Sequence, residues 1–157
     1  MSSAQGRSFG VSRVLGERGV RYVFRCTGEE IEDLLFALAA SSIAFVPSRH
    51  EQGAAFIADV WGRLTGKAGV CLATLGPRAT NLLTGVADAN FDKAPLVAIT
   101  AQGGLDRLHH ESHQRIDVVR MFASVTKWNS VKLELVEKLK RYLQGACRAL
   151  PRTREMS

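Results

Sequence analysis

The sequence has no long apolar run, and its apolar stretches are far shorter than the roughly 20 residues that a membrane-spanning helix needs. Its first ten residues, MSSAQGRSFG, also lack the apolar stretch that follows the positive charge of a secretory signal. These two absences predict neither a membrane protein nor a secreted one, and we expect a cytoplasmic location, with an organelle whose import signal is not recognised as the alternative.

Cysteine is scarce, with three residues in the whole chain: Cys26, Cys71 and Cys147. The number is odd and no two of them form a C-x-x-C pair, so neither a disulfide framework nor a cysteine-based zinc site is predicted. Cys71 lies in the apolar run AGVCLATL and is expected in the core. This cysteine usage is typical of a reducing compartment.

Histidine is also infrequent, but three of the four histidines lie close together at positions 109, 110 and 113. His109 and His113 would share one face of a helix, yet the preceding Gln102-Gly103-Gly104 favours a loop. No carboxylate or cysteine completes a ligand set in the expected geometry, so no metal site is predicted.

The chain carries a net charge of +6, with a pI near 9.7, which raises the question of nucleic-acid binding. The basic residues are scattered up to the segment from Lys127 to Arg154, which holds much of the excess. No aromatic residues alternate with them as in a single-strand binder. A solvated basic surface is therefore preferred, and nucleic-acid binding is kept as a weak alternative.

Apolar periodicity predicts an alternation of helices and strands. Helices are expected at 9–17, 31–41, 51–64, 77–90, 116–122 and 134–150, and strands at 20–24, 43–46, 69–74, 95–100 and 125–131. Residues 69–74 and 95–100 are apolar enough for strands covered on both faces. Gly19 and Gly66 are expected to end helices, and Thr27 to Glu30 match a capping box.

Such an alternation predicts an α/β fold of three layers, with a parallel sheet and helices on both faces. Ligands of these sheets bind outside the carboxyl ends of the strands. This rule selects the loops after Phe24, Val46, Thr74 and Thr100 as the place of a functional site.

The segment from Arg49 to Gln102 contains RHEQGAAFIADVWGRLTGKAGV and TLGPRATNLLTGVADANFDKAPLVAITAQ, and it resembles the N-terminal domain of acetolactate synthase and its relatives. The resemblance extends back to Tyr22-Val23-Phe24 and forward through ESHQRIDVVRMFASVTKWN at 111–129. It covers most of the chain with several motifs in order. We expect residues 9–145 to form this pyrimidine-binding domain, after a flexible N-terminus at 1–8 and before a divergent tail at 146–157.

The resemblance implies thiamine diphosphate as the cofactor and three α/β domains in the complete enzyme. In the family the third domain holds Mg²⁺ and the diphosphate through a Gly-Asp-Gly motif, which this sequence does not contain. The middle and diphosphate-binding domains are thus expected on another chain, and the chain is expected to be a fragment that is inactive alone. FAD occurs in some full-length relatives, but its site would lie in the other domains.

Glu51 is the residue that the resemblance assigns to catalysis. In the family a carboxyl group against N1′ of the aminopyrimidine ring favours the imino form of the cofactor, which then loses the C2 proton of the thiazolium. Such a glutamate is expected in an apolar pocket that raises its pKa. The alternative is structural, because Ser48 to Glu51 also match a capping box that would tie Glu51 to a helix start.

The remaining cofactor-binding candidates follow from the same resemblance, and each has a simpler reading. Gly28 ends the loop after the first strand, where the backbone would approach the ring; otherwise it is an ordinary turn glycine. Asn81 is placed near the pyrimidine, or is only a polar residue at a helix start. Gln114 would reach the active site from a loop, or is an exposed glutamine. Thr74 and Pro77 complete the set.

The sequence departs from the family at two arginines. Arg25-Cys26-Thr27-Gly28 stands where the family usually has Gly-x-Pro-Gly, and Arg78 replaces a glycine before the Thr80-Asn81 pair. Arg78 also places a positive charge in a helix's first turn, which the macrodipole disfavours. A cation at either position is expected to crowd the pyrimidine pocket, as in a decaying or regulatory copy.

The leading functional prediction is a cofactor half-site of a carboligase or decarboxylase that acts on 2-keto acids such as pyruvate. Its partner would be the diphosphate domain of another chain or of a second copy in a homo-oligomer. The alternative is a non-catalytic dimerisation or regulatory module that pairs with a full-length paralogue.

Overall fold

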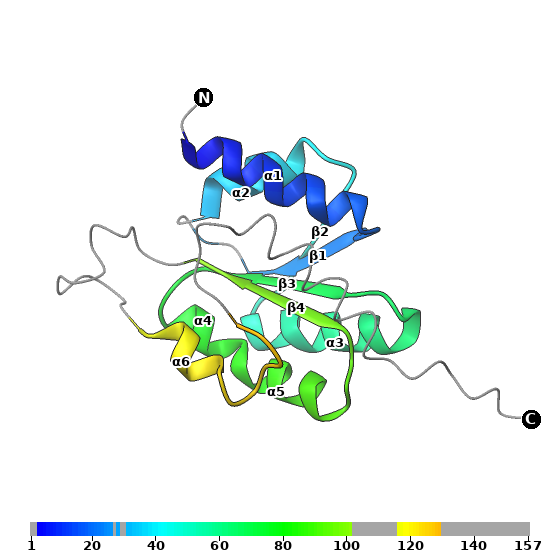
Figure 1. Cartoon of the computed structure of the whole chain (residues 1–157), viewed down its shortest axis with the longest axis vertical. Helices are drawn as coiled ribbons and strands as arrows, with labels where there is room; N and C mark the ends of the chain where they lie inside the picture. Colours follow the sequence, from blue (N-terminus) through cyan, green and yellow to red (C-terminus); the bar gives the residue numbers. More distant parts are fainter. Residues whose placement is uncertain (1–2, 27, 29–30, 102–115, 130–157) are drawn as a thin grey trace, which may run out of the picture.

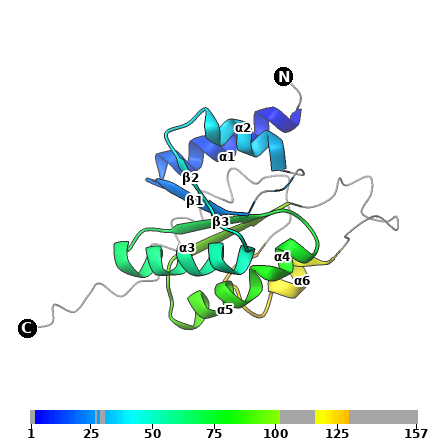
Figure 2. The same cartoon turned by 180° about the vertical axis from the view of Figure 1, so that it is seen from behind.

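The computed structural model describes residues 3–26, 28, 31–101 and 116–129. Its elements are α1 (Ser3–Glu17), β1 (Tyr22–Arg25), α2 (Glu32–Ala39), β2 (Ala44–Pro47), α3 (Glu51–Thr65), β3 (Gly69–Ala73), α4 (Pro77–Asn81), α5 (Leu83–Phe91), β4 (Leu96–Thr100) and α6 (Val118–Phe122). Figure 1 shows the sheet lying between two helical layers, and Figure 2 shows the same layers from behind.

The four strands form one parallel sheet in the order β2-β1-β3-β4. Strand alternation divides the core, because successive side chains of a strand point to opposite faces. Val23, Val70 and Leu72 pack under α1 and α2, whereas Phe24 and Cys71 pack against α3 and α5. The predicted three-layer α/β fold with helices on both faces is confirmed.

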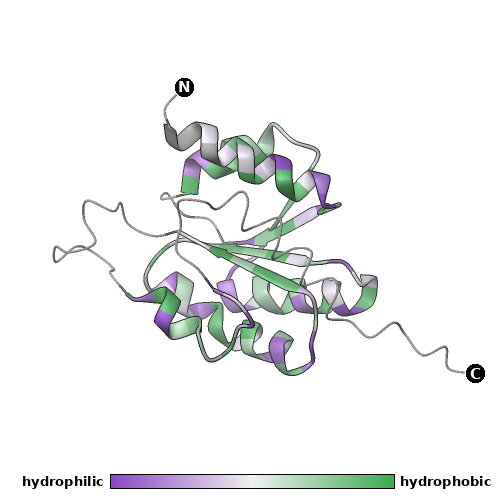
Figure 3. Ribbon diagram, viewed as in Figure 1, coloured by the Kyte–Doolittle hydropathy of each residue, from purple (hydrophilic) through white to green (hydrophobic). Residues whose placement is uncertain are grey.

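The middle of the sheet is the most deeply buried part of the molecule. Every residue of β3 is buried, and Cys71 is fully buried as predicted. β4 was also expected to be covered on both faces, but in the sheet that the described residues form it lies at one edge, and all five of its residues are only half-buried. Its hydrophobic character is plain in Figure 3, so apolar composition predicted the strand but not its place at the edge.

The helix boundaries differ from the predicted ones in two places. α1 begins at Ser3 instead of Phe9, because six residues before the apolar pattern continue the helix. The single helix expected at 77–90 is divided at Leu82, whose N–H bonds to the Ala79 carbonyl three residues back and tightens the turn.

The strand expected at 125–131 is wrong over the residues that the structure describes. Positions 125–129 contain no strand, and the Val125 N–H and the Thr126 hydroxyl both donate to the Phe122 carbonyl at the end of α6. Val125 packs against the α3 side of the core, whereas Trp128 is 50% exposed, so the apolar spacing there does not mark a strand. The helix expected at 134–150 and the capping box at 27–30 lie outside the described residues.

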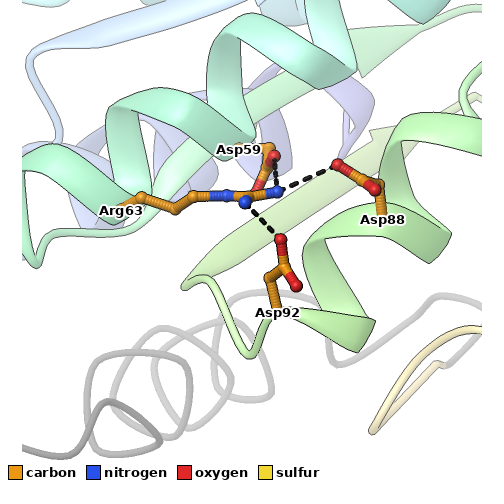
Figure 4. A network of polar contacts seen from close by, with 4 residues as sticks. All are labelled: Asp59, Arg63, Asp88 and Asp92. Atoms are coloured by element: carbon orange, nitrogen blue, oxygen red, sulfur yellow. Dashed lines mark hydrogen bonds and ion pairs between the residues drawn. The ribbon is translucent and has the colours of Figure 1, made fainter.

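A polar cluster fastens α3 to α5 on the helical layer below the sheet (Figure 4). Arg63 of α3 donates from Nε and Nη2 to the carboxylate of Asp59, at 2.9 and 2.5 Å. It also pairs with Asp88 of α5, at 2.9 Å, and with Asp92, the residue that caps the carboxyl end of α5. The hydrogen bonds to Asp59 and the negative charges of the three aspartates raise the pKa of Arg63 above its ordinary value. Burial by itself lowers this pKa, but its effect is the smaller one.

Candidate functional site

The candidate site lies at the carboxyl ends of β1 and β3, the two central strands. The chain leaves β1 toward β2 through α2 on one face, and leaves β3 toward β4 through α4 and α5 on the other. Such a reversal between neighbouring strands opens a crevice in which α/β proteins bind ligands. The loops after Phe24 and Thr74, selected from the sequence, are the ones that meet there.

Gly28 and Thr74 bring these two loops into direct contact. A Cβ atom added at Gly28 would clash with Cγ2 of Thr74 and would lie 3.1 Å from Nη1 of Arg78. Thr74 is buried, so its methyl group has little freedom to give way. The structure thus requires a glycine at position 28 because of a close approach within the chain itself.

Glu51 is the first residue of α3 and is almost completely buried, with 4% of its surface exposed. His50 caps the helix, since its ring Nδ1 accepts the N–H of Gln52 at 3.2 Å. The Ser48 hydroxyl donates to the His50 carbonyl. The capping-box alternative for Glu51 is therefore wrong: the imidazole caps the helix and leaves the carboxylate available for other contacts.

The Glu51 carboxylate is directed toward α4. Asn81 donates from Nδ2 to Oε2 at 2.9 Å, and Nε of Arg78 lies 3.8 Å from Oε1. Burial by itself raises the pKa of Glu51, but hydrogen bonds from Asn81, from its own backbone and from the Cys26 thiol, with the charge of Arg78, outweigh it. The net shift lies below the ordinary value, contrary to the expected raised pKa, because the surroundings of this buried acid are polar.

The two arginines of the departing motifs occupy different places. Arg25 is the last residue of β1, and its guanidinium lies 5.0 Å from the ring centroid of Phe45 on the α1–α2 side of the sheet. Arg78 lies over Gly28 and Glu51, so it is Arg78 that crowds the site. Its charge in the first turn of α4 is offset by the Glu51 carboxylate, which stabilises a cation at this unfavourable position.

The remaining candidates are distributed differently. Pro77 is the first residue of α4 and is exposed; its carbonyl accepts the Thr80 hydroxyl, which fixes the helix start beside the site. Gln114 and the histidines at 109, 110 and 113 lie outside the described residues. Cys26 was missed from the sequence, although it lies two residues after Phe24, in one of the loops that the sheet rule selects.

Metal-ligand clusters and membrane-spanning helices were sought in the described part of the chain. Residues 3–26, 28, 31–101 and 116–129 contain no group of three or more His, Cys, Asp or Glu side chains arranged to hold a metal ion. Over the same ranges no helix has both the length and the apolar character needed to cross a membrane.

Comparison with known proteins agrees with this geometry. Residues 8–121 match the family described as thiamine pyrophosphate enzyme, N-terminal TPP binding domain. The chain is 42% identical to the catabolic acetolactate synthase of Raoultella terrigena, over 93% of this chain and 26% of that protein. It is 40% identical to the acetolactate synthase isozyme 2 large subunit of Escherichia coli, over 87% and 25%.

A plant relative has a similar level of identity. The chloroplastic acetolactate synthase of Arabidopsis thaliana is 41% identical over 84% of this chain and 20% of its own length. The chain thus spans a fifth to about a quarter of these relatives. The family match covers more than half of the chain and includes Gly28, Glu51, Thr74 and Asn81. The chain therefore belongs to the thiamine pyrophosphate enzyme family and contains its N-terminal TPP-binding domain.

Proposed function

We propose that the chain supplies the pyrimidine side of a thiamine diphosphate site in an acetolactate-synthase-like enzyme that joins or decarboxylates 2-keto acids. The observation that carries this proposal is the buried carboxylate of Glu51 at the crevice between β1 and β3. This acid is not needed as the helix cap, since His50 fills that role.

The residues of the crevice fit one end of the cofactor. Glu51 offers a carboxyl group for the ring nitrogen N1′, and Asn81 holds that group in position from α4. The glycine at 28 allows the loop after β1 to approach Thr74 closely. Gln114 remains a predicted contact, and Pro77 supports the start of α4.

The cofactor, when bound, supplies the carbon nucleophile, and the protein supplies binding, orientation and electrostatics. The task of Glu51 is to hold a proton at N1′. Its pKa is lowered in the chain by itself, so this task requires surroundings in which the carboxyl group loses some of its present polar partners. The diphosphate and Mg²⁺ would be held by a domain of another chain or of a second copy.

The proposal is tested by joining this chain to the middle and diphosphate domains of a relative and substituting Glu51→Gln. The variant keeps the size of the side chain and removes its exchangeable carboxyl proton. We expect hydrogen–deuterium exchange at C2 of the bound cofactor to slow by about two orders of magnitude or more, the range for loss of a general acid–base group. The exposed Glu32→Gln on α2 is the matched control.

Unchanged exchange in a folded Glu51→Gln protein with cofactor bound would contradict the assignment. The chain by itself is expected to bind thiamine diphosphate weakly and to form no acetolactate from pyruvate. Sub-micromolar binding by calorimetry would show that the diphosphate end needs no second domain. We place the protein in the cytoplasm, a proposal supported by the odd number of cysteines, by the lack of a C-x-x-C pair in the sequence and by the reduced, buried thiol of Cys71.

A second candidate function, a non-catalytic pairing module, is favoured by the outer face of α3. Gly53, Ile57, Val60 and Leu64 follow one another at helical spacing, and the three apolar side chains are 42%, 49% and 81% exposed. No charged residue interrupts this stripe, and a second copy or a paralogue would cover it.

Sedimentation velocity over a range of concentrations separates this pairing from a monomer. We expect Val60→Lys to weaken self-association, whereas Ser42→Lys, at an exposed position between α2 and β2, leaves it unchanged. A wild-type chain that stays monomeric at the highest concentration contradicts the pairing role.

A further inference from the structure

The Arg78 guanidinium lies where the cofactor's aminopyrimidine ring would contact Glu51 in the proposed function. Its Nε lies 3.8 Å from Oε1 of Glu51, while Oε2 already accepts the Asn81 amide at 2.9 Å. Both carboxylate oxygens therefore face groups on α4. A cation this close to Oε1 competes with a ring nitrogen for the carboxylate, and of the two α4 groups Arg78 is the one held at the longer distance.

The same side chain also fills space beside the loop after β1. Its Nη1 lies 3.1 Å from the place of a Cβ atom on Gly28, so the guanidinium extends from the carboxylate to the backbone on the other side of the crevice. A flat ring placed between Glu51 and Gly28 would meet the guanidinium there.

We propose that Arg78 is a built-in competitor of the cofactor's aminopyrimidine ring for the Glu51 carboxylate. This inference rests on the proposed function and adds a regulator within the chain. Two effects act together: the cation occupies the crevice, and it favours the ionised acid over the protonated acid that the ring nitrogen requires. The side chain is 46% exposed, so water screens the pair and the ligand can displace it.

The test uses the full 157-residue chain and thiamine, which carries the aminopyrimidine without the diphosphate. Arg78→Gln keeps most of the bulk and removes the charge, whereas Arg78→Gly removes both. Because half-exposed ion pairs are weak, we expect Arg78→Gln to lower the Kd by about twofold to fivefold, measured by NMR titration. Arg78→Gly is expected to lower it at least as far.

Two controls separate competition for Glu51 from general charge repulsion of the cationic thiamine. Arg21→Gln removes the same charge from an exposed position just before β1. This position lies at the amino ends of the strands, away from the site, so the Kd is expected to stay unchanged. In a Glu51→Gln background the gain from Arg78→Gln should disappear, because the contested carboxylate is gone.

Each outcome decides the matter. An unchanged Kd in Arg78→Gln, or a gain that persists in the Glu51→Gln background, overturns the competition while leaving the proposed function standing. No thiamine binding by the wild type or any variant at millimolar concentration overturns both. A ¹³C NMR titration of the Glu51 carboxyl adds a readout without ligand: its pKa should rise in Arg78→Gln, and an unchanged pKa overturns the ion pair itself.

Discussion

Replacing Arg63 by methionine should destabilise the domain strongly, because it leaves the buried Asp59 carboxylate without its bidentate partner. Asp59 is only 1% exposed and accepts both Nε and Nη2 of Arg63 (Figure 4). Methionine keeps an unbranched apolar stem of similar length, so the change removes mainly the charge and its hydrogen bonds.

The magnitude follows from the exposure of each partner. Removing one member of a fully buried pair costs about 3–5 kcal/mol, since an unpaired charge remains in the interior. Arg63 is 37% exposed, so water reaches part of the space that it leaves. The pairs with Asp88 and Asp92 are about half exposed and each contributes less than about 1 kcal/mol. We expect a net loss of about 2–4 kcal/mol in the free energy of unfolding.

Urea unfolding followed by circular dichroism measures this loss. Arg13→Met is the matched control, because Arg13 and Glu17 have the same four-residue spacing on α1 but are 71% and 54% exposed. This control should cost less than about 0.5 kcal/mol. Adding Asp59→Asn to Arg63→Met should recover more than half of the loss, because no buried charge then remains. The reasoning fails if Arg63→Met costs no more than Arg13→Met.

Two further predictions concern the site. The pKa of Glu51 lies below its ordinary value of 4.5 in the folded chain, so its contribution to stability is present above about pH 4.5 and is lost as the pH falls through the folded value. The difference in unfolding free energy between wild type and Glu51→Gln should therefore shrink from about pH 7 to about pH 3, and a constant difference would contradict this. Gly28→Ala should destabilise by about 1–3 kcal/mol in thermal or urea unfolding, because its Cβ meets the buried Thr74 methyl. Thr74→Ser should relieve this cost, whereas Gly53→Ala, with open space around it, should not destabilise.

The elements of the core were predictable because burial imposes a period on the sequence that can be read locally. The apolar run at 69–74 predicted the buried central strand β3, and Gly66, which adopts φ 65°, ends α3 where the sequence placed the helix stop. The parallel sheet followed from the alternation of helices and strands, and the rule for parallel sheets selected the loops that form the site. The residues before Phe9 carry no apolar pattern, so the sequence did not predict that α1 begins at Ser3.

The partners of Glu51 were decided by tertiary structure alone. Asn81 is 30 residues away along the chain, and only the packing of α4 beside the start of α3 brings its amide to the carboxylate. The lowered pKa follows from these distant contacts, whereas the apolar neighbours of Glu51 in the sequence predicted a raised one. The capping-box pattern from Ser48 to Glu51 failed because the helix begins later than the pattern requires: His50 is the N-cap, and the Ser48 N–H donates to the Arg25 carbonyl.

The two arginines show the same division. The sequence identified Arg25 and Arg78 as departures from the family pattern and predicted that a cation at either position would crowd the pocket. Strand alternation and packing place Arg25 over Phe45 on one side of the sheet, whereas α4 places Arg78 against Glu51 on the other. The sequence by itself determined the fold, the family and which residue types stand in the loops. Only the folded chain decided which of those side chains meet, because contacts between residues distant in sequence depend on how the elements pack.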